Sequence, residues 1–315
     1  MLRVDLKGAI IPEAPGTGKA APPRARIGRP RFRPHRGMPR SDAIFSQLNR
    51  AAEPYRDPLA ALDWTRLSTE HWWLPPACLS LAGLPEFEAL PENLRRRLSH
   101  YEFVHFLHIG LWLEGLFMER LAASRRWASL AEHAARLHAI REEAGHSLMF
   151  LKLMEVSGVS LPACAFRPPR LADFLGRHAP PDALLFRLAV VVGEEVPDKF
   201  NQRIRAGGGI DPVVGRLVTL HRVDEARHIA QARIQVETSL LALGPWRRRV
   251  VGQLMRPLIR QFAHTLFFPP AAVYELAGLT DGRRWRRLAA ANPARHALVQ
   301  SCLAPTLAWL RRLGL

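Results

Sequence analysis

Apolar residues recur at helical intervals along most of the chain, and this spacing predicts long amphipathic helices rather than strands. Proline and glycine mark the expected helix ends. Pro91 and Pro212 stand at first-turn positions, and Gly158 and Gly244 follow the last turns. The pattern therefore indicates an all-α protein, with its long helices expected at residues 91–124, 127–157, 182–206 and 212–243.

Shorter elements are expected on both sides of these helices. Residues 41–67 contain short helical pieces, and the apolar turn around Trp72 and Trp73 is expected to pack against the bundle. One short helix is predicted before Pro180, and two or three further helices after Gly244. The chain is thus expected to form a single helical domain over residues 41–315, with a central bundle at about residues 90–243.

Acidic residues interrupt the apolar faces of two of the long helices. On the first helix, Glu114 lies on the same stripe as Phe103 and Phe117. A buried carboxylate needs a cation, a metal or a proton, so Glu114 either pairs with an arginine of another helix or binds a metal. On the third helix the apolar run ends at Glu194 and Glu195. One of these two must point inward, and the helical period does not decide which.

The second long helix carries Glu143 and His146 in an E-x-x-H spacing. At about 100° per residue the two side chains lie on one face, which is how one helix gives a carboxylate and an imidazole to a di-metal site. The spacing alone is also compatible with a solvated Glu–His pair. Glu142, one turn before His146, is a second candidate for the carboxylate.

The fourth long helix carries the most specific pattern. His221, Glu225 and His228 stand at positions i, i+4 and i+7, on a face that also contains Val214 and Leu217. Three polar side chains in an apolar stripe need a common partner, although a core histidine can instead bond to a backbone carbonyl. The other face is expected to stay in water through Arg222, Arg227 and Arg233.

Composition limits the class of protein. The net charge of +17 invites a nucleic-acid partner. Much of the excess, however, lies in a basic arm at residues 1–40, whose proline and arginine content cannot form a core and predicts disorder. The other arginines are assigned to outer helix faces, so nucleic acid is not an expected partner. Met38 is an alternative start of the native chain.

The cysteines and apolar runs bear on the compartment. Cys78, Cys164 and Cys302 are widely spaced and are predicted to be reduced core thiols. The apolar runs are too short to span a bilayer, and the N-terminus has no apolar segment typical of a signal peptide. The sequence therefore predicts a cytoplasmic protein without a membrane partner.

The four long helices together supply Glu, Glu-x-x-His, Glu and His-x-x-x-Glu-x-x-His in that order. This order matches a carboxylate-bridged di-iron bundle with one added imidazole. Oxygen-rich ligation with some imidazole suits iron or manganese better than zinc.

At these residues the sequence resembles the AurF-type non-haem di-iron oxygenases, whose namesake is a p-aminobenzoate N-oxygenase. The resemblance rests on the tract from Asp211 to His221 and on the run from Asp224 to His228, and it covers residues 90–243. It implies a ferritin-like bundle that holds two iron ions and uses O₂, and it selects Glu194 over Glu195. The metal ligands that it implies are Glu114, Glu143, His146, Glu194, His221, Glu225 and His228.

Three further residues near the implied ligands are relevant to function. Pro197 and Asp198 differ from the residues of the nitroarene-forming members, so the resemblance does not identify the substrate. Asp224 is a candidate acceptor for an imidazole N–H, or else a solvated surface charge.

The resemblance implies an O₂-dependent monooxygenase that N-oxygenates an amine, in the first place an arylamine, in secondary metabolism. One alternative is a di-iron hydroxylase or desaturase that acts on a free or carrier-bound acid. A second is a non-catalytic iron-binding protein, which the third histidine and the long C-terminal extension disfavour. An external electron donor, a ferredoxin or a reductase, is an expected partner. An acidic carrier protein is a candidate partner for the basic surface, and a homodimer is compatible with the sequence.

Overall fold

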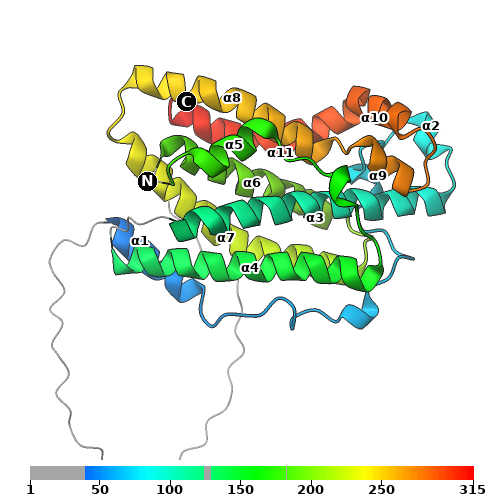
Figure 1. Cartoon of the computed structure of the whole chain (residues 1–315), viewed down its shortest axis with the longest axis horizontal. Helices are drawn as coiled ribbons and strands as arrows, with labels where there is room; N and C mark the ends of the chain where they lie inside the picture. Colours follow the sequence, from blue (N-terminus) through cyan, green and yellow to red (C-terminus); the bar gives the residue numbers. More distant parts are fainter. Residues whose placement is uncertain (1–39, 124–128, 182) are drawn as a thin grey trace, which may run out of the picture. The chain divides into compact units, whose positions relative to one another are not determined.

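The computed structural model describes residues 40–123, 129–181 and 183–315, and these residues form helices and no strand (Figure 1). The predicted all-α class is confirmed. In chain order the helices are α1 (Arg40–Ala51), α2 (Pro85–Glu88), α3 (Glu92–Ala123), α4 (Leu130–Ser157), α5 (Arg170–His178), α6 (Leu184–Gly207), α7 (Pro212–Leu240), α8 (Pro245–Phe267), α9 (Ala271–Leu276), α10 (Gly282–Ala291) and α11 (Pro293–Arg312). Single 3-10 turns lie at η1 (Trp64–Arg66), η2 (Pro76–Cys78) and η3 (Ala163–Ala165).

Side-chain caps and a left-handed glycine fix the ends of the long helices. The Ser129 side chain accepts a hydrogen bond from the backbone N–H of Glu132 at the start of α4, and Gly158 ends this helix at a φ of 68°. At the start of α7 the Asp211 carboxylate accepts two backbone N–H groups, and Pro212 occupies the first turn. These local signals explain why the end of α4 and the start of α7 lie at the predicted positions.

Some predicted helix limits need correction. Four helices, α8 to α11, follow α7 in the described part of the chain, where two or three were expected, because the segment turns at Pro270, Asp281 and Asn292. Helix α7 ends at Leu240 rather than near residue 243. The expected starts at Trp127 and Asp182 lie outside the described residues, as does the basic arm with its alternative start at Met38.

The four long helices pack as two pairs. Helix α3 runs beside α4, α6 beside α7, and α4 also contacts α7 (Figure 1). Helices α3 and α4 approach closely at Gly110, where a Cβ would lie 2.8 Å from the Phe150 ring. The C-terminal helices α8 and α11 contact α6, and α1 contacts α4. Helices α1, α8 and α11 thus cover part of the bundle, and the inward-facing side chains of α4, α6 and α7 are buried.

The apolar turn behaves as predicted, whereas one cysteine does not. Trp73 and Leu74 are fully buried against the bundle, and the Asp211 backbone N–H donates to the Trp72 carbonyl at 2.7 Å. Cys78 is buried, as is Cys302, but Cys164 is exposed because it lies on the loop turn η3.

None of the described helices is both long enough and apolar enough to cross a membrane.

Candidate metal centre

The seven side chains singled out from the sequence are all buried, and the structure brings them together from four helices. Helix α3 gives Glu114, α4 gives Glu143 and His146, α6 gives Glu194, and α7 gives His221, Glu225 and His228. They form two groups in which the candidate ligand atoms lie within 4.8 Å of one another. One group is Glu114, His146 and His221, and the other is Glu143, Glu194, Glu225 and His228.

Two carboxylates join the groups. Glu143 places one oxygen 3.4 Å from Nδ1 of His146 and the other 3.1 Å from Nδ1 of His228. Glu225 places Oε1 3.6 Å from Nδ1 of His146 and Oε2 3.6 Å from Nδ1 of His228. Each carboxylate therefore turns one oxygen toward each group. This is the arrangement that a carboxylate bridge between two metal ions requires.

Of the two remaining carboxylates, Glu114 belongs to the group of His146 and His221 alone. Its oxygen Oε1 lies 3.5 Å from Nε2 of His221 and 3.9 Å from Nδ1 of His146, and Oε2 accepts a hydrogen bond from the Ser147 hydroxyl at 2.6 Å. The alternative of an arginine salt bridge at this position is absent among the contacts of the described residues.

The structure shows which glutamate of each adjacent pair, Glu142–Glu143 and Glu194–Glu195, faces the interior of the bundle. Glu143 faces the interior of the bundle, whereas Glu142 contacts Arg227 at 2.6 Å. Glu194 faces the interior, whereas Glu195 contacts Arg233 at 2.6 Å and accepts a hydrogen bond from Thr306. The placement agrees with the register expected for Glu143 and Glu194.

The expectation that the arginines of α7 extend into water is wrong. Arg222, Arg227 and Arg233 each bond to a buried carboxylate, respectively Asp198 at 2.9 Å, Glu142 at 2.6 Å and Glu195 at 2.6 Å. The reason is that α4 and α6 place a second row of acidic side chains just outside the inner row. A guanidinium is the group that offsets the cost of burying such a carboxylate.

Each imidazole is held through the ring nitrogen that points away from the centre. His146 donates from Nε2 to Asp224 at 3.1 Å, and His228 donates from Nε2 to Glu142 at 2.9 Å. His221 lies with Nδ1 3.2 Å from the amide of Asn201. These contacts leave one nitrogen of every ring free to face the carboxylates.

Sequence reasoning named Asp224 as a candidate for this role but missed Glu142 and Asn201. The signal for Glu142 was its place directly before the E-x-x-H pair on the packed face of α4. No local pattern marks Asn201, which lies on another helix from the imidazole that it contacts.

Without metal ions, the buried carboxylates of the site outnumber its positive charges, and this shifts the pKa values of its side chains. Burial alone would lower the pKa of His146, but the hydrogen bond to Asp224 and the glutamates nearby raise it to about 10. Burial likewise opposes the charged form of His221, yet Glu225 and Glu114 raise its pKa to about 9. Burial and the charge of Glu225 raise the pKa of Glu194 well above its ordinary value. Protons thus occupy these side chains where metal ions could take their place.

The residues present fit a pair of metal ions. Glu225 is 1% exposed, yet neither of its oxygens has a well-aligned hydrogen-bond donor within the described part of the chain, and the same is true of Oε1 of Glu114. Nδ1 of His228 lies 3.1 Å from a Glu143 oxygen but makes no well-aligned hydrogen bond there either. Buried polar atoms that point into one space without hydrogen bonds are costly unless a metal completes them. Four carboxylates and three imidazoles suit iron or manganese.

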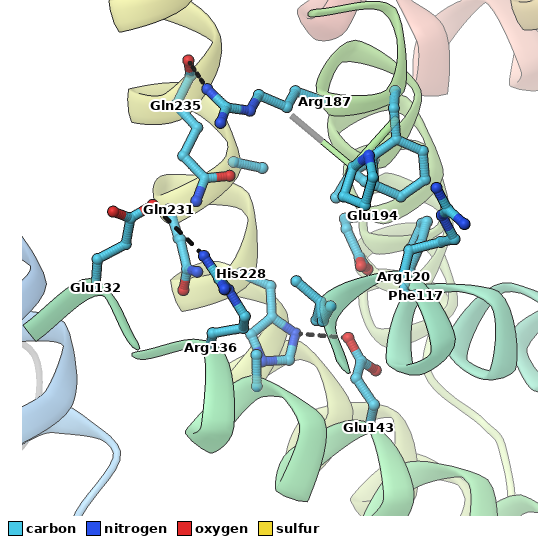
Figure 2. Close-up of a pocket in the computed structure, with 16 residues that line it drawn as sticks. Phe117, Arg120, Glu132, Arg136, Glu143, Arg187, Glu194, His228, Gln231 and Gln235 are labelled. Atoms are coloured by element: carbon cyan, nitrogen blue, oxygen red, sulfur yellow. Dashed lines mark hydrogen bonds and ion pairs between the residues drawn. The ribbon is translucent and has the colours of Figure 1, made fainter. Parts of the chain in front are cut away.

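A pocket with a cavity volume of about 60 Å³ opens onto this centre (Figure 2). One end is formed by Glu143, Glu194 and His228, and Figure 2 shows the His228 ring directed at Glu143. Its remaining charged and amide lining comes from Arg120, Glu132, Arg136, Arg187, Gln231 and Gln235.

A second pocket, with a cavity volume of about 30 Å³, touches the opposite group through Glu114, His221 and Glu225 and is otherwise mainly apolar. Phe117 and Glu194 line both pockets. Periodicity in one helix at a time could not predict these spaces, because each is enclosed by several helices.

Comparison with known proteins agrees with this geometry. The uncharacterized protein Rv0885 of Mycobacterium tuberculosis and the uncharacterized protein Mb0909 of Mycobacterium bovis are each 23% identical over 236 residues, which is 72% of this chain and 68% of the relative. The sequence profile described as "P-aminobenzoate N-oxygenase AurF" matches residues 40–314, which extends the resemblance well beyond residues 90–243. The chain therefore belongs to the p-aminobenzoate N-oxygenase AurF family of oxygenases.

Proposed function

We propose that this protein is a non-haem di-iron oxygenase that uses O₂ to oxidise the nitrogen of an amine substrate. The favoured substrate class is an arylamine. The observation that carries the proposal is the pair Glu143 and Glu225, each with one oxygen toward His146 and one toward His228. Such a pair is suited to bridge two metal ions, and membership of an N-oxygenase family gives the chemistry.

The proposed ligands divide between two irons. Glu114, His146 and His221 would hold one iron, and Glu194 and His228 would hold the other, with Glu143 and Glu225 shared. Two ferrous ions held in this way supply the electrons and binding positions that O₂ needs for activation. The protein's own part is to fix the ligands, to exclude water through the buried surroundings, and to hold the amine in the adjoining pocket.

The stoichiometry of the reaction implies a partner. Insertion of one oxygen atom of O₂ into an N–H bond gives a hydroxylamine, and the second atom leaves as water after it takes up two electrons and two protons. We propose that a ferredoxin or a reductase supplies these electrons.

The pockets favour an enzyme over an iron-storage protein. A cavity lies directly beside Glu143, Glu194 and His228, where a substrate would meet the metal ions. The apolar pocket beside Glu114 and His221 keeps a second reaction open, the oxidation of a C–H bond of a free or carrier-bound acid. An acidic carrier protein would then be the partner that the basic surface attracts.

Two measurements test this proposal. Iron analysis of the protein after anaerobic loading should give about two irons per chain. Glu225→Ala should remove most of this iron and His146→Ala about half of it, while the helical content stays. The reduced protein should then convert arylamines to products that carry oxygen from isotopically labelled O₂. Full iron loading in both variants would remove the metal from this site, and labelled products from carrier-bound acids alone would replace N-oxygenation by C–H oxidation.

A further inference from the structure

Arg227 lies between two carboxylates on the outer side of the candidate metal centre. Its Nη2 atom is 2.6 Å from Oε1 of Glu142 on α4 and 2.5 Å from Oδ1 of Asp224 on α7. The Arg227 side chain is 17% exposed and that of Glu142 only 3%. One guanidinium nitrogen therefore joins two helices through two charge-assisted hydrogen bonds.

The second oxygen of each carboxylate holds an imidazole. Oε2 of Glu142 accepts the Nε2 hydrogen of His228 at 2.9 Å, and Oδ2 of Asp224 accepts the Nε2 hydrogen of His146 at 3.1 Å. These two histidines belong to different groups of the centre. A continuous path of hydrogen bonds thus runs from His146 through Asp224, Arg227 and Glu142 to His228.

We propose that Arg227 is a positioning residue that fixes one imidazole in each half of the metal centre. The proposal rests on the proposed function, since it concerns the residues that would hold the two metal ions. The physical reason is charge. Glu142 and Asp224 repel each other, and Glu142 is almost entirely buried, so each keeps its place beside an imidazole only while a cation lies between them. Outer hydrogen bonds of this kind set the ring orientation and the donor strength of a metal-binding histidine.

The chain contains matched controls on the same helix. Arg222 bonds to Asp198, whose other partners are Gln202 and Lys199. Arg233 bonds to Glu195, whose other partner is Thr306. Like Arg227, each of these arginines neutralises a buried carboxylate of a neighbouring helix, but neither carboxylate contacts an imidazole in the described structure. Arg222→Met and Arg233→Met therefore remove an equivalent ion pair without reaching the centre.

The test is a titration of the metal-free full-length protein with Co²⁺, followed by its visible absorption, which gives the affinity of each of two sites. Removal of an outer partner of a metal-binding histidine weakens binding by roughly 10- to 100-fold. Glu142→Ala should weaken one site, Asp224→Ala should weaken the other, and Arg227→Met should weaken both. The Arg222→Met and Arg233→Met controls should bind Co²⁺ like the unaltered protein, and Arg227→Lys should recover most of the loss because it keeps a cation between the two carboxylates.

A second readout separates positioning from general destabilisation. In the Co²⁺ protein, the outer N–H protons of bound histidines give strongly shifted proton resonances that exchange slowly with water while they are hydrogen-bonded. Arg227→Met should speed the exchange of two such resonances, and neither control should. If Arg227→Met matched the controls in affinity and in exchange, while unaltered protein bound two Co²⁺ ions, the inference would be overturned. If unaltered protein bound no Co²⁺ pair, the proposed function itself would fail.

Discussion

Glu143 on α4 and Glu225 on α7 stand in the same relation to the two histidines of the centre. Each directs one carboxylate oxygen toward His146 and the other toward His228, at distances between 3.1 and 3.6 Å. The two glutamates come from different helices and from positions 82 residues apart in the sequence. Under the proposed function, their equivalence divides the seven candidate ligands into shared and unshared ones, so substitutions in the two classes should have different effects.

Loss of a shared carboxylate should cost more iron than loss of an unshared one. Glu143→Ala or Glu225→Ala removes a ligand from both metals and should leave well under one iron per chain. Glu114→Ala or Glu194→Ala removes a ligand from one metal only and should leave about one iron per chain. Iron analysis after anaerobic loading and gel filtration measures this. Equal losses in all four variants would show that no carboxylate is shared.

Substitution of Glu194 should affect iron loading, whereas substitution of Glu195 should affect only the stability of the fold. Glu194→Gln places an amide where a ligand is proposed and should impair iron loading. Glu195→Gln should leave loading intact, because Glu195 faces Arg233 and Thr306, but it should lower the free energy of unfolding by about 1–3 kcal/mol through the weakened ion pair. Iron content and chemical denaturation of the two variants check this pair. The reverse pattern would show that the centre uses the outer carboxylate of α6.

The metal-free protein should lose stability as the pH rises from neutral to alkaline. The pKa of His146 is raised from 6.5 to about 10 and that of His221 to about 9, because carboxylates surround both rings. A histidine whose pKa is higher in the folded than in the unfolded state contributes its full stabilisation below 6.5, and this contribution disappears as the pH rises to the folded pKa. The melting temperature of the metal-free protein should therefore fall between pH 7 and pH 10.

Bound iron should abolish this pH dependence of the melting temperature, because the metal would replace the protons of both rings. The loaded protein should keep its melting temperature over the same range, and loading at pH 7 should release protons that a weakly buffered solution detects. A metal-free protein whose melting temperature rises toward pH 10 would contradict the surplus of carboxylates at the centre.

Phe117 should control the size of the substrate that the enzyme accepts. Its side chain lines both pockets, so Phe117→Ala should join them into one larger space beside the metal ligands. Deletion of a large buried ring typically costs about 3–5 kcal/mol of stability. The cost for Phe117→Ala should lie at the lower end of this range, because the ring already borders two cavities and so makes fewer packing contacts. Iron content should stay near that of the unaltered protein, while bulkier arylamines become substrates in a mass-spectrometric product screen. An unchanged substrate range would show that the two pockets do not form one binding site.

The sequence allowed the inner half of the centre to be predicted but not its outer half. Glu114 and the His221, Glu225 and His228 set interrupt an apolar stripe, and that anomaly can be recognised in a single helix. Glu142 and Glu195 do not differ from their neighbours by helical period alone. Their positions depend on α7, whose arginines reach across to α4 and α6.

The same reason explains the error over Arg222, Arg227 and Arg233. An arginine on the polar side of one helix is expected in water when that helix is considered alone. In the bundle, that side faces the acidic outer row of the neighbouring helices. The end of α4 and the start of α7 were predictable because Gly158 and Asp211 act locally, whereas the two pockets depend on how several helices pack.

The measurement that tests the central claim most directly is Mössbauer spectroscopy of the protein loaded with isotopically enriched iron and oxidised by O₂. Two high-spin ferric sites are expected in equal amounts, coupled magnetically to a diamagnetic ground state, because Glu143 and Glu225 would hold both ions side by side. Their signals should therefore show no internal magnetic field at low temperature. Isolated paramagnetic ferric ions, or a single iron per chain at full loading, would contradict a carboxylate-bridged pair at this site.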